Sequence, residues 1–403
     1  MAGPYEIQLR YAAHYWTVLH SADHLYQEGG EVITEGLCLF CLNWGNIKAG
    51  QQWTSSQTEK DDAAAELCRN YADAGMHILS LLQHPNERIR WLESAVTAAR
   101  RLKEPLFEGR HLGNLANAYY ALGETRRAIE HHEQALIVIR EIGDRHGEGY
   151  VLNNLGAAYA NLGELSRAVE SYQQCFVIAR EIGDRRVEGA VLGNLGLIYA
   201  ALGKPHDAIE CYEQYLVIAR EIGDRRCEDI ALTNLGDAYK KLGELRRAIA
   251  FFEQALVIDR DIGDQHGEGA ALGNLGNAYY ALGETRRAIE LYEQALIIIR
   301  KIGDRRHEGN VLGSLGVAYK ELGELRRAVE LYEQSFVIAD ETGNPRAEGH
   351  ALFNLSLTLH ELGEYERSSL CGKVALMIYA QIEDPWPEHV REILAGQRGQ
   401  QEE

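Results

Sequence analysis

The 403-residue sequence has few cysteines, no long apolar run and a minority of basic residues. Its seven cysteines are an odd number and are scattered, which favours a reducing compartment over a disulfide framework. Only Cys38 and Cys41 lie close together, and no second pair stands at zinc spacing, so we predict no metal site. The N-terminus lacks a basic-then-apolar leader, and no run of about 18 apolar residues occurs. We therefore expect a soluble, cytoplasmic protein.

The charge balance excludes further classes of function. Lysine and arginine number 41 against 60 aspartates and glutamates, which gives a net charge of −19. Nucleic acids and anionic membranes attract basic surfaces, so neither is an expected partner. The sequence contains no G-x-x-x-x-G-K-[ST] phosphate-binding loop and no recognisable arrangement of nucleophile, base and acid. We expect no cofactor and no enzymatic activity.

What the sequence does contain is a repeat of 40 residues. Asn154-Leu155-Gly156 recurs as Asn-Leu-Gly at 194–196, 234–236 and 274–276, and in softened form at 114–116, 314–316 and 354–356. Within one copy, apolar residues at helical spacing predict a first helix near 145–162 and a second near 164–182. Glycine follows every first helix, where a positive φ ends a helix at no steric cost. Aspartate at 184 and its equivalents suits the cap of the next helix.

Gly156 and its equivalents stand inside the first helix, where glycine is about 1 kcal/mol less favourable than alanine. Close approach of the second helix is the expected reason. Each copy is thus a helical hairpin that buries its apolar face only by stacking on its neighbours.

The residues Leu152, Leu155, Gly156, Tyr159 and Tyr172 stand at the offsets of the tetratricopeptide repeat (TPR) motif, with small residues at 168 and 175. The sequence resembles the 40-residue TPRs of LGN/Pins-type adaptors over about residues 105–384. The resemblance implies an all-α, right-handed TPR superhelix of about seven to eight hairpins. We divide the chain into a divergent helical N-terminal cap (1–60), a degenerate TPR-like hairpin (61–104) whose first helix spans 61–82, seven TPR units (105–384) and a C-terminal helix or tail (385–403).

The N-terminal part also resembles the segment that precedes TPR arrays in bacterial STAND-type signalling ATPases. The stretches that carry this likeness are ADHLYQEGGEVITEGLCLFCLNWGNIKAGQQW and HPNERIRWLE. As an alternative function, this resemblance implies that the array senses a trigger and restrains an ATPase whose nucleotide-binding domain is absent from this chain.

The recurring amide is the main candidate for ligand binding. In TPR proteins the residue before the Leu-Gly pair points into the concave groove, where an amide can donate to and accept from a bound peptide. The resemblance implies a ladder formed by Asn114, Asn154, Asn194, Asn234, Asn274, Ser314 and Asn354. The alternative is that these amides bond the neighbouring helix and only stabilise the stack.

Three other groove-facing rows vary between copies, as expected for residues that read a partner. They begin at Asn117, Tyr120 and Arg110 and recur every 40 residues. Relaxed surface drift is the alternative explanation. Our candidates for specificity are Tyr120, Tyr150, Lys240, Lys241 and Tyr280.

Two charged features are assigned to structure. Glutamate occupies the first turn of every first helix (108, 148, 188, 228, 268, 308 and 348), where a carboxylate suits the helix dipole. Arg-Arg pairs begin several second helices and are expected to be solvated or paired with glutamates. The predicted function is therefore non-enzymatic binding of a peptide or protein segment in the groove, with self-association through the solenoid ends as an additional option.

Overall fold

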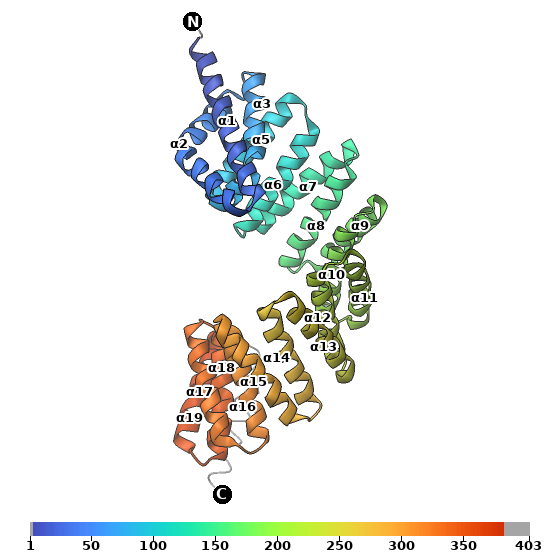
Figure 1. Ribbon diagram of the computed structural model, residues 1–403, viewed down its shortest axis with the longest axis vertical. Coiled ribbons are helices and arrows are strands. Elements are labelled where there is room, and N and C mark those ends of the chain that lie inside the picture. The colour runs from blue at the N-terminus through green and yellow to red at the C-terminus, as the bar shows by residue number, and fades with distance from the viewer. Residues whose placement is uncertain (1–2, 383–403) are drawn as a thin grey trace. The chain divides into compact units, whose positions relative to one another are not determined.

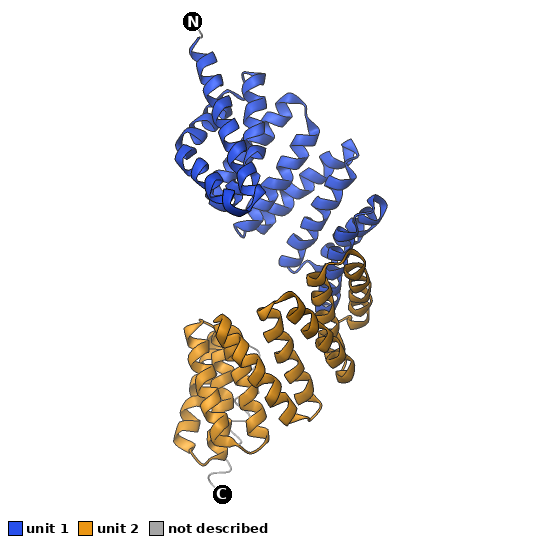
Figure 2. Ribbon diagram, viewed as in Figure 1, with its two compact units in different colours: residues 1–202 blue, residues 203–403 orange. Residues whose placement is uncertain are grey.

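The fold consists of helical hairpins throughout the part of the chain that is described. The computed structural model describes residues 3–382, so the predicted C-terminal segment 385–403 lies outside it. Within these residues there are 19 α-helices, one short 3₁₀ helix and no strand (Figure 1). The predicted all-α class is confirmed. The chain divides into two compact units, residues 1–202 and 203–403 (Figure 2), and each is described by itself.

The first unit contains ten α-helices and the 3₁₀ helix. From α5 onward each helix packs against the next in the chain, and the first helices α6 and α8 also touch. The elements are α1 (Pro4–Glu28), η1 (Gly30–Val32), α2 (Ile33–Gln57), α3 (Asp62–Ala74), α4 (Met76–Leu82), α5 (Pro85–Leu102), α6 (Pro105–Ala121), α7 (Thr125–Ile142), α8 (Arg145–Asn161), α9 (Leu165–Ile182) and α10 (Arg185–Ala201).

The second unit contains nine described helices in the same sequential packing. Its first helices α14, α16 and α18 also contact one another in turn. The helices are α11 (Pro205–Ile222), α12 (Arg225–Lys241), α13 (Leu245–Ile262), α14 (Gln265–Ala281), α15 (Thr285–Ile302), α16 (Arg305–Glu321), α17 (Leu325–Glu341), α18 (Pro345–Glu361) and α19 (Tyr365–Gln381).

The N-terminal helices share a core of their own. Leu19 of α1, Phe40 of α2 and Tyr71 of α3 are buried together with Trp91 of α5. The Tyr71 hydroxyl donates to the Ala12 carbonyl at 2.7 Å, so its polar atom is satisfied inside the core. This core joins α1 and α2 to the degenerate hairpin of α3, α4 and α5.

The prediction of a single helix over residues 61–82 is wrong. The chain forms two helices there, α3 and α4, which are separated by Gly75. A Cβ on Gly75 would lie 2.9 Å from Leu19 Cγ, so the Leu19 side chain of α1 occupies the space that a side chain at this position would need. The buried Asp23 carboxylate of α1 accepts from the Ile78 amide at 2.7 Å and so caps the start of α4. The break is thus imposed by α1.

The helix ends in the repeats are those the sequence predicts. The seven glycines that follow the first helices have φ between 70° and 80°: Gly123, Gly163, Gly203, Gly243, Gly283, Gly323 and Gly363. Asp144 caps α8 by accepting from the Gly147 amide at 3.0 Å, and its equivalents cap their own helices in the same way. Both predictions are confirmed. The register of every hairpin is therefore set by local chemistry.

The glycine inside the first helix packs against an aromatic ring of the second helix. A Cβ on Gly156 would lie 2.7 Å from the Tyr172 ring, and one on Gly276 would lie 2.5 Å from the Tyr292 ring. Both rings are almost completely buried. The predicted close approach of the partner helix is confirmed, and it explains why a residue unfavourable for helices is kept there.

Two copies that lack this glycine carry a smaller partner. In α6 the residue is Ala116, and the second helix presents the buried imidazole of His132 instead of a phenol ring. In α18 the residue is Ser356, and glycine stands at 372. The Ser356 hydroxyl donates to the Ser368 carbonyl at 2.7 Å and so fills the space with a hydrogen bond. The Ala116–His132 pair thus keeps nearly the volume of a glycine–tyrosine pair, whereas the smaller Ser356–Gly372 pair is accompanied by a hydrogen bond between the two helices.

The glutamate of the first turn is held by two arginines. Glu148 is buried, and its carboxylate accepts from Arg140 Nε at 2.7 Å and from Arg145 Nη1 at 2.5 Å. The same arrangement recurs at Glu228 and Glu308. Burial alone would raise the pKa of Glu308, but its hydrogen bonds to the two arginines lower the pKa below its usual value. The structural role predicted for this row is confirmed.

The arginine pairs at the start of the second helices behave as predicted. Arg127 forms an ion pair with Glu124 at 2.7 Å, and Arg247 forms one with Glu244 at 2.8 Å. The Arg287 guanidinium also lies 3.9 Å from the ring centroid of Tyr279. The second arginine of each pair is thus engaged by neighbouring side chains, as the sequence analysis expects.

The glycine–tyrosine contact predicts a compensating pair of substitutions. Gly276→Ala should lower the free energy of unfolding by about 1–2 kcal/mol, because overpacking of about 1–3 kcal/mol exceeds the gain in helix propensity. Adding Tyr292→His recreates the Ala116–His132 pair and should recover most of the loss. Urea unfolding of the two single variants and the double variant measures the coupling. Additive effects in that cycle would contradict the contact.

The last repeat offers a natural gap in the arginine–glutamate contact. Glu348 faces Asp340, where the other repeats carry arginine, and burial together with Asp340 raises the pKa of Glu348. Asp340→Arg should stabilise the protein at pH 7 by about 1 kcal/mol. Because the new pair lowers the folded pKa of Glu348, the gain should disappear as pH falls below about 4.3. Urea unfolding at both pH values measures it.

Asp340→Ala is the control for that substitution, because it removes the repulsion without adding a guanidinium. An arginine variant no more stable than the alanine variant would show that the contact contributes nothing beyond relief of repulsion.

Candidate ligand-binding face

The ladder residues occupy equivalent places on successive first helices. Each lies half-buried in the middle of its helix, next to a fully buried leucine. α6 touches α8, and α14, α16 and α18 touch in turn, so neighbouring ladder positions share one face within each unit. The members are Asn114 on α6, Asn154 on α8, Asn194 on α10, Asn234 on α12, Asn274 on α14, Ser314 on α16 and Asn354 on α18.

The six ladder asparagines are not used to hold the helices together. Within residues 3–382, none of their side chains makes a hydrogen bond to another residue. The Asn154 side-chain nitrogen is completely buried from solvent and still has no partner there. Ser314 differs, because its hydroxyl hydrogen-bonds the Tyr292 phenol. The stacking alternative therefore has no hydrogen bond behind it at the asparagines, and their role in binding stays a prediction.

A hollow of about 400 Å³ opens on this face in the second unit. It lies between α16 and α18, and the Tyr332 ring of α17 also lines it. Ser314 and Asn354 of the ladder contribute to its wall. So do three positions from the variable rows, namely Asn310, Val317 and His350. The structure thus brings together residues that the sequence analysis assigned separately to the ladder and to two variable rows.

The variable rows are interlinked by hydrogen bonds. Asn117 of α6 donates from Nδ2 to the Tyr150 hydroxyl of α8 at 2.6 Å. In the second unit the Tyr292 hydroxyl donates to Asn277 Oδ1 at 2.7 Å. Tyr150 is nevertheless half-exposed, so the side that faces away from Asn117 is open to solvent. These contacts fix the side chains in place before any ligand arrives.

The other four specificity candidates differ in their exposure to solvent and in whether they already have a bonding partner. Tyr120 is exposed, and Lys241 lies exposed at the end of α12. Lys240 forms an ion pair with Asp237 at 2.6 Å, so its charge is already engaged. Burial and a hydrogen bond with Glu321 raise the pKa of Tyr280 to about 12, so its phenol stays neutral. Tyr120 and Lys241 are therefore exposed and, among the described residues, without a hydrogen bond or ion pair, whereas Tyr150 is more exposed than Tyr120 but is bonded to Asn117.

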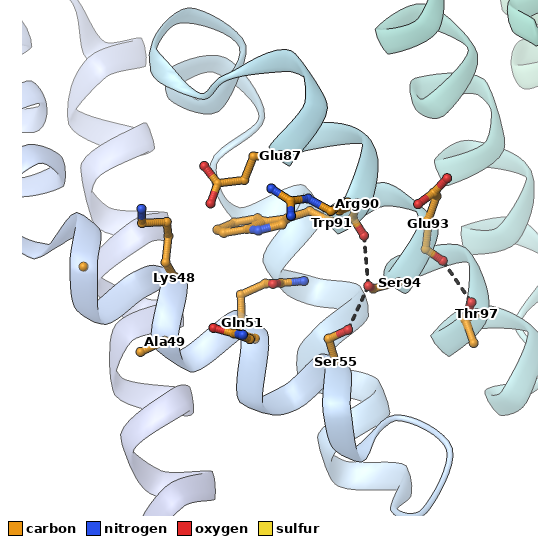
Figure 3. A pocket seen from close by; sticks show the side chains of 12 residues that line it. Lys48, Ala49, Gln51, Ser55, Glu87, Arg90, Trp91, Glu93, Ser94 and Thr97 are labelled. Atoms are coloured by element: carbon orange, nitrogen blue, oxygen red, sulfur yellow. Dashed lines mark hydrogen bonds between the residues drawn. The ribbon is translucent and has the colours of Figure 1, made fainter.

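A second hollow lies in the N-terminal segment and was not predicted. It encloses about 700 Å³ between α2 and α5, which is within the usual range for ligand pockets. Figure 3 shows the Trp91 indole projecting from α5 toward α2, with Arg90 and Glu87 beside it and Lys48 opposite. The Ser55 and Ser94 hydroxyls share a hydrogen bond of 2.8 Å across the two helices. One hint of this hollow in the sequence is Trp91, which stands at the position that His131 occupies in the next repeat.

The repeat geometry is matched by a known family. Residues 107–181, 187–261, 229–301 and 267–341 match the model of the tetratricopeptide repeat family. These stretches cover more than half of the sequence, so the chain belongs to the tetratricopeptide repeat family. Its repeats make it a protein-interaction module. No match is found among curated proteins.

Solved structures share the fold over most of the chain. A signal transduction ATPase with numerous domains (STAND) with a TPR sensor, from Pyrococcus horikoshii, is 16% identical, with a TM-score of 0.62 over 94% of this chain and 65% of the other. Aspartyl phosphate phosphatase F from Bacillus subtilis is 13% identical, with a TM-score of 0.57 over 95% and 96%. BtubC from P. vanneervenii is 22% identical, with a TM-score of 0.50 over 54% and 92%. At these identities the likeness concerns the fold alone.

Two further findings bear on the predictions. Among the described residues, no helix is both long enough and apolar enough to cross a lipid bilayer. In the same part of the chain, no three histidine, cysteine, aspartate or glutamate side chains are placed to hold a metal ion.

The unbonded ladder amides predict the effect of removing one. Asn154→Ala should leave the melting temperature unchanged or slightly raised, because no intramolecular hydrogen bond is lost and alanine favours the helix. If the amide instead stabilised the stack, the loss would be about 1–3 kcal/mol. Thermal unfolding followed by circular dichroism distinguishes the two. Asn344→Ala is the positive control, because the Asn344 side chain caps α18 through the Ala347 amide at 3.2 Å.

Proposed function

We propose that the face formed by the first helices binds an extended peptide or protein segment, and that the ladder amides bond its backbone. Binding involves no covalent chemistry, and the chain acts as a non-enzymatic interaction module. Within each unit the ligand lies along successive first helices and meets one amide for each repeat. Side chains of the variable rows then select among partners.

The observation that carries this proposal is the set of half-buried ladder amides that make no hydrogen bond to another described residue. A buried amide left without partners is unfavourable by about 1–3 kcal/mol, so such groups are rare unless water or a ligand satisfies them. Here the side-chain amides of six repeats make no hydrogen bond to another described residue, and at Asn154 the amide nitrogen is also completely buried. Because an amide both donates and accepts, it complements a peptide unit whatever side chain the peptide carries.

The hollow between α16 and α18 supports the same interpretation. Two ladder positions and three variable positions meet there in a space of about 400 Å³, large enough for one or two side chains of a bound segment. The ladder would bind the peptide backbone of any segment, whereas Asn310, Val317 and His350 would determine which ligand side chain fits into the hollow. Specificity in this region therefore requires the variable rows.

The test is a capture experiment with three immobilised proteins. They are the wild type, the variant with alanine at Asn154, Asn194, Asn234 and Asn274, and a control with alanine at Gln134, Gln174, Gln214 and Gln294. The control removes the same number of amides from the second helices. We expect the wild type and the glutamine variant to retain the same partner from host lysate, and the asparagine variant to lose it.

Titration calorimetry with the captured segment should then show at least a tenfold weaker Kd for the asparagine variant, since each lost hydrogen bond contributes about 0.5–1.5 kcal/mol. Helicity and melting temperature should match the wild type. Equal capture by all three proteins would move the contact to another surface and overturn the proposal.

A second candidate is the sensing and restraining arm of a STAND-type ATPase. What favours it is the hollow of about 700 Å³ between α2 and α5, which lies in the part of the sequence that resembles the segment before such arrays. A trigger bound there would alter how α5 packs against α6. An adjacent reading frame that encodes a phosphate-binding-loop domain, whose ATP turnover this chain suppresses, would support it. Turnover unaffected by the chain would exclude it.

A further inference from the structure

One repeat differs from all the others at two positions that contact each other. Six repeats carry glycine early in the first helix, at 109, 149, 189, 269, 309 and 349, and a non-ionised residue 30 positions later. The two positions pack together, because a Cβ on Gly109 would lie 2.7 Å from Ile139 and one on Gly269 would lie 3.0 Å from Ile299. In the repeat of α12 and α13 the pair is Asp229 and Asp259. Two carboxyl groups thus replace a contact that is apolar elsewhere.

The Asp259 side chain is buried and unsatisfied. Its residue is 1% exposed, and its Oδ1 atom has no hydrogen-bond partner among the described residues. The carboxylate rests against the backbone of Gly267 in the first turn of α14, where a Cβ would lie 2.6 Å from Asp259 Cγ. The carboxyl group therefore lies between α12, α13 and α14.

The charged groups around it are almost all acidic. Asp229 faces it from α12, and Asp264 and Glu268 face it from the start of α14. On its own helix the neighbouring Arg260 is turned to Glu268, with Nε 2.6 Å from Oε1. Burial first, and then these three carboxylates, raise the pKa of Asp259 to about 7. Burial and Asp264 raise the pKa of Asp229 to about 6.

We propose that the α12–α13–α14 segment is a proton-dependent contact in which Asp259 is packed as a neutral acid and loosens when it ionises. In the neutral form Asp259 carries its own proton and adds no negative charge to its contact with Asp229. When the proton leaves to solvent, two carboxylates face each other in a buried site. The repulsion weakens the packing of α13 against α12 and α14, while other repeats keep their apolar contact.

The sign of the pH effect follows from the direction of the shift. The folded protein binds the Asp259 proton more tightly than the unfolded chain, whose aspartate pKa is about 3.9. The contact therefore contributes fully at pH values below about 4, loses strength between about 4 and 7, and is weakest above 7. Acidification across this window strengthens the segment, which is opposite to the effect of an ion-paired carboxylate.

The experiment compares thermal unfolding of four proteins from pH 5 to pH 8.5 in buffer with a chelator, so that the curves report protons only. They are the wild type, Asp259→Asn, the double variant Asp229→Gly/Asp259→Ile, and Asp207→Asn as a control at an exposed carboxylate. The double variant restores the Gly269–Ile299 pair of the next repeat. The melting temperature of Asp259→Asn and of the double variant, minus that of the wild type, should rise as pH increases from 5 to 7. The control should show no such rise.

Hydrogen exchange at each pH gives the local readout. Amides of α13 should exchange faster in the wild type than in the double variant at pH 8, and at similar rates at pH 5. Amides of α15 should not distinguish the two proteins. A difference curve for Asp259→Asn that is flat between pH 5 and 8, or equal protection of α13 at pH 8, would overturn the proposal.

Discussion

The contact between a glycine of the first helix and an aromatic ring of the second is the constraint on which each hairpin depends. At Gly156 and Gly276 the ring takes the space of a side chain, so the two helices approach more closely than larger residues would permit. Where the glycine is absent, the partner shrinks, as at Ala116 with His132. The Ala116–His132 pair thus keeps nearly the volume of a glycine–tyrosine pair, as a close-packed interior requires, whereas the last repeat has the Ser356–Ser368 hydrogen bond in place of the ring contact. Stacking of the hairpins follows from that fixed separation.

The glycine–ring contact and the arginine–glutamate contact together cover much of the surface of each first helix. The ring covers one side of it, and the glutamate of its first turn is bound by arginines from the preceding helix and its own helix. The ladder position lies on what remains, half-buried, and its six asparagines make no side-chain hydrogen bond to another described residue. A polar row kept in register through a scaffold that does not bond it is best explained by something outside the scaffold.

Much of the fold was predictable because the signals for it are local. Glycine at 163 and aspartate at 184 mark helix ends through their own backbone and side-chain preferences, so their equivalents place the boundaries throughout the array. The break at Gly75 was not predictable, since Leu19 and Asp23 impose it from a helix more than fifty residues earlier. The hollow beside Trp91 escaped prediction for the same reason, and so did the bond that joins Asn117 to Tyr150. The ladder could be located from sequence, but its unbonded state could not.

The repeats also show how substitutions are tolerated in a linear array. In a repeat array each unit contacts mainly its neighbours, so a change at one contact is most directly offset by the residue it meets. His132 offsets Ala116, and the Ser356–Ser368 hydrogen bond offsets the missing glycine and ring of the last repeat. Asp229 and Asp259 also both differ from the residues of the other repeats. Here the second aspartate does not offset the first, because it adds a like charge to a buried contact. A pair that departs from the apolar contact in this direction is most stable with a bound proton, so this contact weakens as pH rises, whereas an arginine–glutamate contact weakens as pH falls.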